Sequence, residues 1–190
     1  MNAALLNDLR RALHTHKYER TDTGIHLPSA QMIIGGAFSA RVDDGPWVVA
    51  HNAVADEFID LLLNVVLGNN SAPSAWYIAP FTSATTPTSS LTAATFTAAQ
   101  TEYTGYSQAT RQAWTFDALS TSQSMVNSQA PATFTIGASG ATITGAGLLS
   151  ASAKSATTGT LAAAGLFSAA NTLGAGSTLT VEYGINGTAT

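Results

Sequence analysis

The sequence predicts a mainly β protein: an antiparallel β-sandwich, jelly-roll or immunoglobulin-like, with one or two short helices and an extended N-terminal arm. Short apolar segments recur from residue 75 onward, separated by stretches rich in Thr, Ser, Ala and Gly. Residues 132–136 and 178–183 alternate apolar and polar side chains, as strands with one buried face do. The 190 residues fit one domain, whose core needs neither a metal nor a disulfide.

Residues 1–30 are predicted to form an N-terminal helix followed by an extended arm. Within residues 3–13 the apolar positions 5, 6, 9, 12 and 13 form one stripe of a short helix. Eleven residues are marginally helical alone, so this helix must dock on another surface to persist. Residues 14–30 lack a sustained period, and an extended chain of that length reaches roughly 55 Å. The side chains expected to contact a partner are His14, His16, Lys17, Tyr18, Glu19, Arg20 and His26.

The β-sandwich body is predicted over residues 31–190. Its first strand, 31–39, is expected to be interrupted by Gly35 and Gly36; a turn follows at 43–46 and a strand at 47–49. The clearest helix is 53–67, which we expect Asn52 to cap and Gly68 to end in the left-handed conformation. One face of this helix is expected to be buried, made of Val54, Phe58, Leu61, Leu62, Val65 and Val66.

The later strands are expected at residues 75–81, 110–116, 132–137, 141–150, 159–168 and 177–185. Between the first two of these strands, residues 82–101 predict a long loop pinned by Leu91 and Phe96. Gly145 and Gly147 are interpreted as positions where another chain segment packs closely against a strand. The three tryptophans are expected in the core: Trp47, Trp76 and Trp114.

Charge is scarce and unevenly distributed along the chain. Only 9% of residues are charged, against about 25% in an ordinary soluble domain, and residues 1–60 hold 13 of the 18. Residues 61–190 hold only five charges, and so few are acceptable where neighbouring proteins cover the surface, which favours an assembly subunit. A secreted or structural domain with a Ser/Thr-rich surface is the alternative. The net charge of −4 predicts no nucleic-acid partner, and apolar runs of about four residues predict no membrane span.

No constellation of residues predicts catalysis, a metal or a cofactor. The chain has no cysteine and no Gly-x-Ser-x-Gly motif, and all four histidines lie in the first 51 residues, in or near the arm. His14 and His16 would need two more metal ligands, such as Glu19 or Asp22. We therefore expect a protein that is not an enzyme.

Arg111 is one of two basic residues beyond residue 60, and it lies three residues before Trp114. Its guanidinium can stack on an aromatic ring or pair with a carboxylate such as Glu102. Both an internal salt bridge and a contact with a partner subunit remain open for Arg111 and Trp114.

Five stretches resemble a family of tailed-bacteriophage virion proteins encoded among head genes: HTHKYERTDTGIHLP (14–28), LLNVVLG (62–68), WYIAPF (76–81), ATRQAW (109–114) and LLSASAKSATTGTL (148–161). The resemblance spans most of the chain, and its motifs are structural. It implies a capsid decoration, or cement, protein on the capsid surface of the virion, assembled in the host bacterial cytoplasm. The implied partners are the major capsid protein and other copies of this chain, as a homo-oligomer.

Other functions are compatible with the same sequence. The chain can instead be a tail, fibre or head–tail joining protein of the virion. A carbohydrate-binding β-sandwich would use surface aromatic rings, with Tyr103, Tyr106 and Trp114 as candidates.

Overall fold

The computed structural model describes residues 18–20, 26–28, 32–117 and 123–189. The chain divides into two compact units, residues 1–33 with 187–190 and residues 34–186. In the first unit, β1 (Tyr18–Arg20) pairs antiparallel with β2 (His26–Pro28). The chain therefore reverses direction within the segment expected to be extended, and its reach is shorter than that of a fully extended arm. The helix expected at 3–13 lies outside the described residues.

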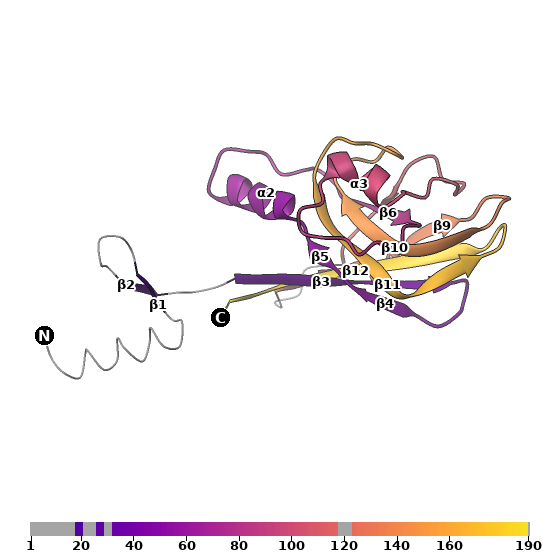
Figure 1. Cartoon of the computed structure of the whole chain (residues 1–190), viewed down its shortest axis with the longest axis horizontal. Helices are drawn as coiled ribbons and strands as arrows, with labels where there is room; N and C mark the ends of the chain where they lie inside the picture. Colours follow the sequence, from indigo (N-terminus) through magenta and orange to yellow (C-terminus); the bar gives the residue numbers. More distant parts are fainter. Residues whose placement is uncertain (1–17, 21–25, 29–31, 118–122, 190) are drawn as a thin grey trace, which may run out of the picture. The chain divides into compact units, whose positions relative to one another are not determined.

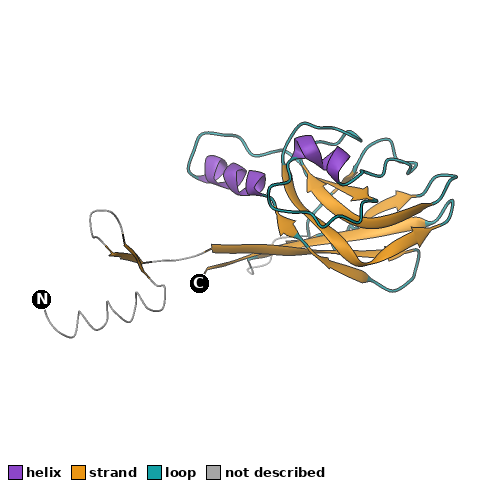
Figure 2. Cartoon of the chain, in the orientation of Figure 1, coloured by secondary structure: helices purple, strands orange, loops and turns teal. Residues whose placement is uncertain are grey.

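The larger unit confirms the predicted β-sandwich, with strands in two antiparallel sheets (Figures 1 and 2). The first sheet has the order β5-β11-β10-β6-β7, formed by Ala53–Val54, Leu161–Leu173, Ala141–Leu149, Tyr77–Phe81 and Gln112–Ala113. The second has the order β4-β3-β12-β8, formed by Val48–His51, Met32–Val42, Thr178–Ala189 and Ser124–Val126, with β9 (Ala132–Thr135) also paired to β12.

The core contains the side chains that the alternating patterns place on one face. Phe134 of β9 and Leu179, Val181 and Tyr183 of β12 are buried. Gly147 of β10 is confirmed as a position of close packing, because a Cβ there would lie 2.6 Å from a ring carbon of Phe96. Small side chains on β10 therefore admit large aromatic rings from other segments.

Several predicted elements differ from the structure. The expected loop 82–101 contains a helix, α3 (Ala93–Ala99), with a capping box between Thr92 and Thr95. Leu91 and Phe96 are buried, as expected of anchors. The strand expected over 110–116 is reduced to β7, β8 forms where no strand was expected, and β11 is longer than predicted.

The prediction that Gly35 and Gly36 interrupt the first strand is wrong. Both lie within β3, and a Cβ on Gly36 would be 2.5 Å from the Gly184 carbonyl oxygen. Glycine here allows β12 to approach closely. Trp47 is also not a core residue: it is 40% exposed, with the Arg41 guanidinium 4.9 Å from its ring centroid.

The helix predicted at 53–67 is α2 (Asp56–Val66); its predicted start is wrong, whereas its end lies within one residue of the predicted one. Ala53 and Val54 instead pair with β11 as β5, so the N-cap is Ala55, without a side-chain cap. The C-cap is Leu67 in the right-handed region, and Gly68 does not have a positive φ. No residue of α2 is fully buried, so the expected face is only partly covered.

Candidate interaction surface

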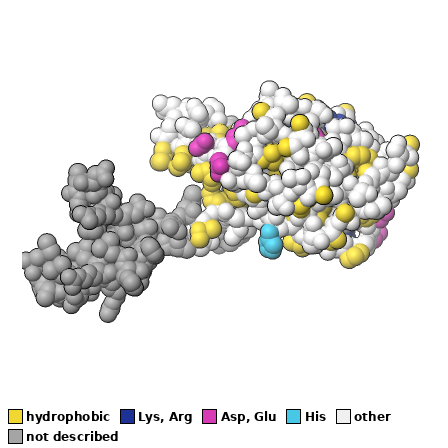
Figure 3. All heavy atoms as spheres, viewed as in Figure 1, with side chains coloured by type: hydrophobic (Ala, Val, Ile, Leu, Met, Phe, Trp, Pro, Cys, Tyr) yellow, Lys and Arg dark blue, Asp and Glu magenta, His cyan; other side chains and the backbone are white. Residues whose placement is uncertain are grey.

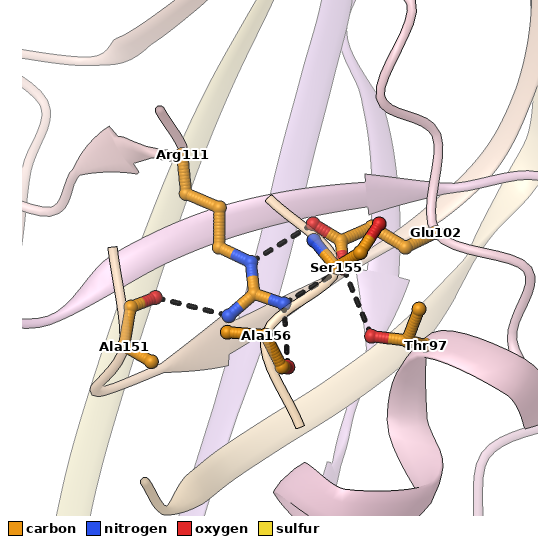
Figure 4. Close-up of polar contacts among 6 residues, drawn as sticks. All are labelled: Thr97, Glu102, Arg111, Ala151, Ser155 and Ala156. Atoms are coloured by element: carbon orange, nitrogen blue, oxygen red, sulfur yellow. Dashed lines mark hydrogen bonds and ion pairs between the residues drawn. The ribbon is translucent and has the colours of Figure 1, made fainter. Parts of the chain in front are cut away.

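Arg111, a sequence-predicted site residue, belongs to a buried polar network (Figure 4). Its Nε donates to Oε1 of Glu102 at 2.9 Å and its Nη2 to Oε2 at 2.7 Å. Both side chains are fully buried. The guanidinium also donates to the carbonyl oxygens of Ala151 and Ala156, at 2.9 and 3.1 Å.

Glu102 is equally well satisfied. Its Oε2 also accepts from the Thr97 hydroxyl at 3.1 Å and from the Ser155 backbone N–H at 3.2 Å, which ties the end of α3 to the β10–β11 connection. Bidentate geometry and these extra hydrogen bonds are what a buried ion pair needs to offset its desolvation. Of the two open interpretations, the structure supports the internal salt bridge.

Lys154 lies on the β10–β11 connection and binds a second loop. Its Nζ donates to the carbonyl oxygens of Thr104 and Tyr106, at 3.0 and 2.8 Å, and lies 3.8 Å from the centroid of the Tyr106 ring. Burial lowers the pKa of Lys154, although the nearby Glu102 charge opposes this shift. Burial also raises the pKa of the Tyr106 hydroxyl, and Glu102 adds to the rise. Lys154 therefore holds the β10–β11 connection against the loop that contains Thr104 and Tyr106.

The aromatic residues proposed for sugar binding do not form an exposed platform. Tyr106 and Trp114 are buried, and only Tyr103 is partly exposed. Trp114 donates from Nε1 to the Tyr183 carbonyl oxygen at 3.0 Å, and its ring packs against that of Tyr183. These two rings are core residues, which contradicts a sugar site built on all three.

The N-terminal half of α2 is firmly attached to the body. Oε2 of Glu57 accepts from the backbone N–H groups of Ala93 and Leu161, both at 2.9 Å. Phe58 packs edge-on against Trp76, with ring centroids 5.6 Å apart. Side chains of α2 thus bind the start of α3 and the start of β11.

The opposite side of α2 carries exposed apolar side chains. Leu63, Val66 and Leu67 are 51%, 73% and 81% exposed. Asp56 and Asp60 are also exposed, and Figure 3 shows acidic and hydrophobic side chains gathered over α2. We define the α2 outer face as Asp56, Asp60, Leu63, Val66 and Leu67. Exposed apolar groups rimmed by polar ones are typical of protein-interaction sites.

The sequence contains a sign of this exposed face, which the prediction of a single buried face on helix 53–67 missed. Residues 61–63 and 65–67 are all apolar, so they surround the helix instead of occupying one stripe. A helix at the edge of a sandwich buries one side only. Some of these side chains therefore had to be exposed.

The surface of residues 34–186 is acidic. This unit contains eight acidic and three basic residues. Each of the three basic side chains contacts the protein itself: Arg111 pairs with Glu102, Lys154 binds carbonyl oxygens, and Arg41 lies over Trp47. Positive charge is thus available mainly from residues 1–33.

The arm residues are only partly described. Tyr18, Glu19 and Arg20 lie on β1 and His26 lies on β2, with Arg20 opposite His26 in the register. His14, His16 and Lys17 lie outside the described residues. The structure therefore brings Arg20 and His26 to neighbouring strands.

Two hollows lie beside His51, the histidine outside the arm. One is lined by residues of β4, β11 and the segment containing Pro87. The other, of about 550 Å³, is lined by residues of β3, β12 and Asn52, whose Oδ1 is buried without a hydrogen-bond partner. Within the described ranges, no three His, Cys, Asp or Glu side chains are grouped to hold a metal ion.

The chain was compared with family models, curated proteins and solved structures. No family model, curated protein or solved structure matches the chain. Among the helices of the described residues, none combines the length and the hydropathy needed to cross a membrane.

Proposed function

We propose that this chain is a capsid decoration (cement) protein of a tailed bacteriophage, which binds the assembled shell of major capsid protein and stabilises it without catalysing a reaction. The observation that carries the proposal is the α2 outer face, an exposed apolar surface rimmed by Asp56 and Asp60. The sequence resemblance to head-gene-encoded virion proteins supports the phage assignment.

The proposed mechanism divides the work between the two parts of the chain. The β-sandwich lies over junctions between capsid subunits, and residues 1–30 reach along the shell or to a neighbouring copy. A segment that orders on binding contacts a large area for its length, although it loses chain entropy. Binding the assembled shell better than free subunits stabilises the shell, and many copies add their effects.

The test is to add purified protein to shells that lack it. We expect the full chain to bind and to raise the temperature at which the shells come apart. A variant lacking residues 1–30 is the matched comparison, because the cut precedes the unit formed by residues 34–186. We expect this variant to fold, as checked by circular dichroism, and to bind shells more weakly.

Two results would contradict the proposal. Full-length protein that leaves shells undecorated would exclude a cement role. Truncated protein that decorates shells as well as the full chain does would remove the arm from the mechanism. A tail, fibre or head–tail joining role is the alternative, and copy number separates it: six or about twelve copies per particle form a ring, whereas cement requires hundreds.

A further inference from the structure

The α2 outer face combines two kinds of chemistry. Asp56, Asp60, Leu63 and Leu67 follow one another at intervals of four, three and four residues, so they form one stripe along the helix. Val66 lies beside Leu63, three positions further on. A partner for this stripe must bring apolar side chains together with positive charge.

Residues 3–13 of the same chain have this composition. Leu5 and Leu9 lie on the predicted apolar stripe of this segment, and Arg10 and Arg11 follow them directly. Residues 3–13 contain two basic residues, Arg10 and Arg11, and one acidic residue, Asp8, whereas α2 contains three acidic residues and no basic one. The two segments therefore carry opposite net charge, and a helix of eleven residues needs a surface to dock on in order to persist.

From this complementarity we infer that residues 3–13 of one copy bind the α2 outer face of a second copy. The inference rests on the proposed function and names one of its contacts. The two surfaces in the contact differ, so each copy keeps a free segment or a free face after one contact forms. Such a heterologous contact continues from copy to copy or closes into a ring, as covering a shell requires.

The experiment measures self-association of the full chain in solution by sedimentation. The face variant is Leu63→Gln with Leu67→Gln, and the segment variant is Leu5→Gln with Leu9→Gln; glutamine retains helix propensity. Each variant alone should dissociate, with a dissociation constant raised about tenfold or more. Val49→Thr is the control, since Val49 is an exposed apolar residue on β4, and it should associate like the unaltered chain.

Mixing the two variants gives the most specific result. The face variant still has an intact segment and the segment variant still has an intact face, so an equimolar mixture should form mixed pairs that neither variant forms alone. Asp60→Lys should weaken association, and added salt should weaken that of the unaltered chain, because opposite charges face one another.

Three results would overturn the inference. The first is a full chain that stays monomeric at every soluble concentration. The second is a segment variant that associates as strongly as the unaltered chain, which would indicate pairing between two α2 helices. The third is a mixture of the two variants that forms no mixed pairs. These measurements contain no shells. Failure here therefore leaves the decoration experiment unaffected, and failure of decoration leaves this contact unaffected.

Discussion

At the scale of single residues, Arg111 and Glu102 show how a protein with few charges uses them. Both are buried and paired at 2.7 Å, and their other hydrogen-bond partners are two backbone carbonyls, the Thr97 hydroxyl and the Ser155 N–H. Ser155 itself has a positive φ of 58°, a conformation that a non-glycine residue adopts at a local cost. The ion pair therefore holds the β10–β11 connection in one arrangement.

Arg111→Met should destabilise the fold strongly. The substitution retains much of the side-chain volume but leaves the Glu102 carboxylate buried without its counter-charge, which costs about 3–5 kcal/mol. The measurement is the free energy of unfolding in denaturant. Arg41→Met is the control, because Arg41 makes a cation–π contact with the exposed Trp47 worth about 1 kcal/mol or less.

The double variant Arg111→Met with Glu102→Met separates loss of the pair from loss of packing. It should be more stable than Arg111→Met alone, because no unpaired charge is left in the interior. Equal stability of the single and double variants would show that the charge is not the cause.

Asp117 predicts a pH dependence. Hydrogen bonds lower its pKa, chiefly the one from the Ser128 hydroxyl at 2.6 Å, with help from the backbone N–H groups of Gln129 and Ser128. A lowered pKa contributes stability that is fully present above the ordinary value of about 3.9 and is lost as the pH falls through the folded-state value.

Asp117→Asn should therefore destabilise the protein at pH 7 and have little effect once the pH is below the folded-state pKa. The measurement is the free energy of unfolding across this range. A difference between the variant and the unaltered chain that persisted unchanged at the lowest pH would show that the carboxylate charge is not responsible.

Single residues also show what sequence reasoning can reach. Glu102 was a predictable partner for Arg111 because so few other charges are available in this part of the chain. The carbonyl groups of Ala151 and Ala156 were not predictable, since backbone acceptors leave no mark on residue type. The burial of Trp114 was expected, whereas the exposure of Trp47 was not predictable, because aromatic residues occur in cores and at interfaces alike.

At the scale of elements, α2 depends on anchors at its N-terminal half. Glu57→Ala should destabilise the protein by about 1–3 kcal/mol, because the buried N–H groups of Ala93 and Leu161 lose their acceptor. Asp60→Ala is the control on the same helix and should change the stability by about 0.5 kcal/mol or less. Hydrogen exchange of the α2 amides should accelerate in the first variant only.

Gly147→Ala tests the packing of β10 against α3. The added methyl group would lie 2.6 Å from the Phe96 ring, so the ring or the strand must move, at a cost of about 1–3 kcal/mol. Gly35→Ala is the control in a strand, because its Cβ would meet its nearest neighbour at 3.6 Å. Equal stability losses in the two variants would contradict the packing argument.

Elements were predictable where their period was strong. The strands β6 and β10 and the start of β12 were expected close to their observed positions, because apolar runs or alternation bounded by turn residues mark them. The helix α3 was missed because its Ala and Thr residues show no apolar period, and its one large side chain is Phe96. The start of α2 was wrong because pairing with β11 takes Ala53 and Val54, a tertiary effect that local propensity does not contain.

At the scale of the whole molecule, charge divides along the chain. Residues 34–186 have a net charge of −5 and residues 1–33 have a net charge of +1. The sequence predicted the sandwich and a concentration of charge in residues 1–60, but not a difference in sign between these two units. It did not predict the hairpin of β1 and β2 or the exposure of α2, because both depend on which surfaces the rest of the fold leaves free.

The most direct test of the proposed function is the number of copies of this chain in a purified virus particle, measured by quantitative mass spectrometry against the major capsid protein. A cement role predicts hundreds of copies, in a fixed ratio to the capsid subunits. Absence of the chain from particles, or a ring of about six or twelve copies, would contradict it.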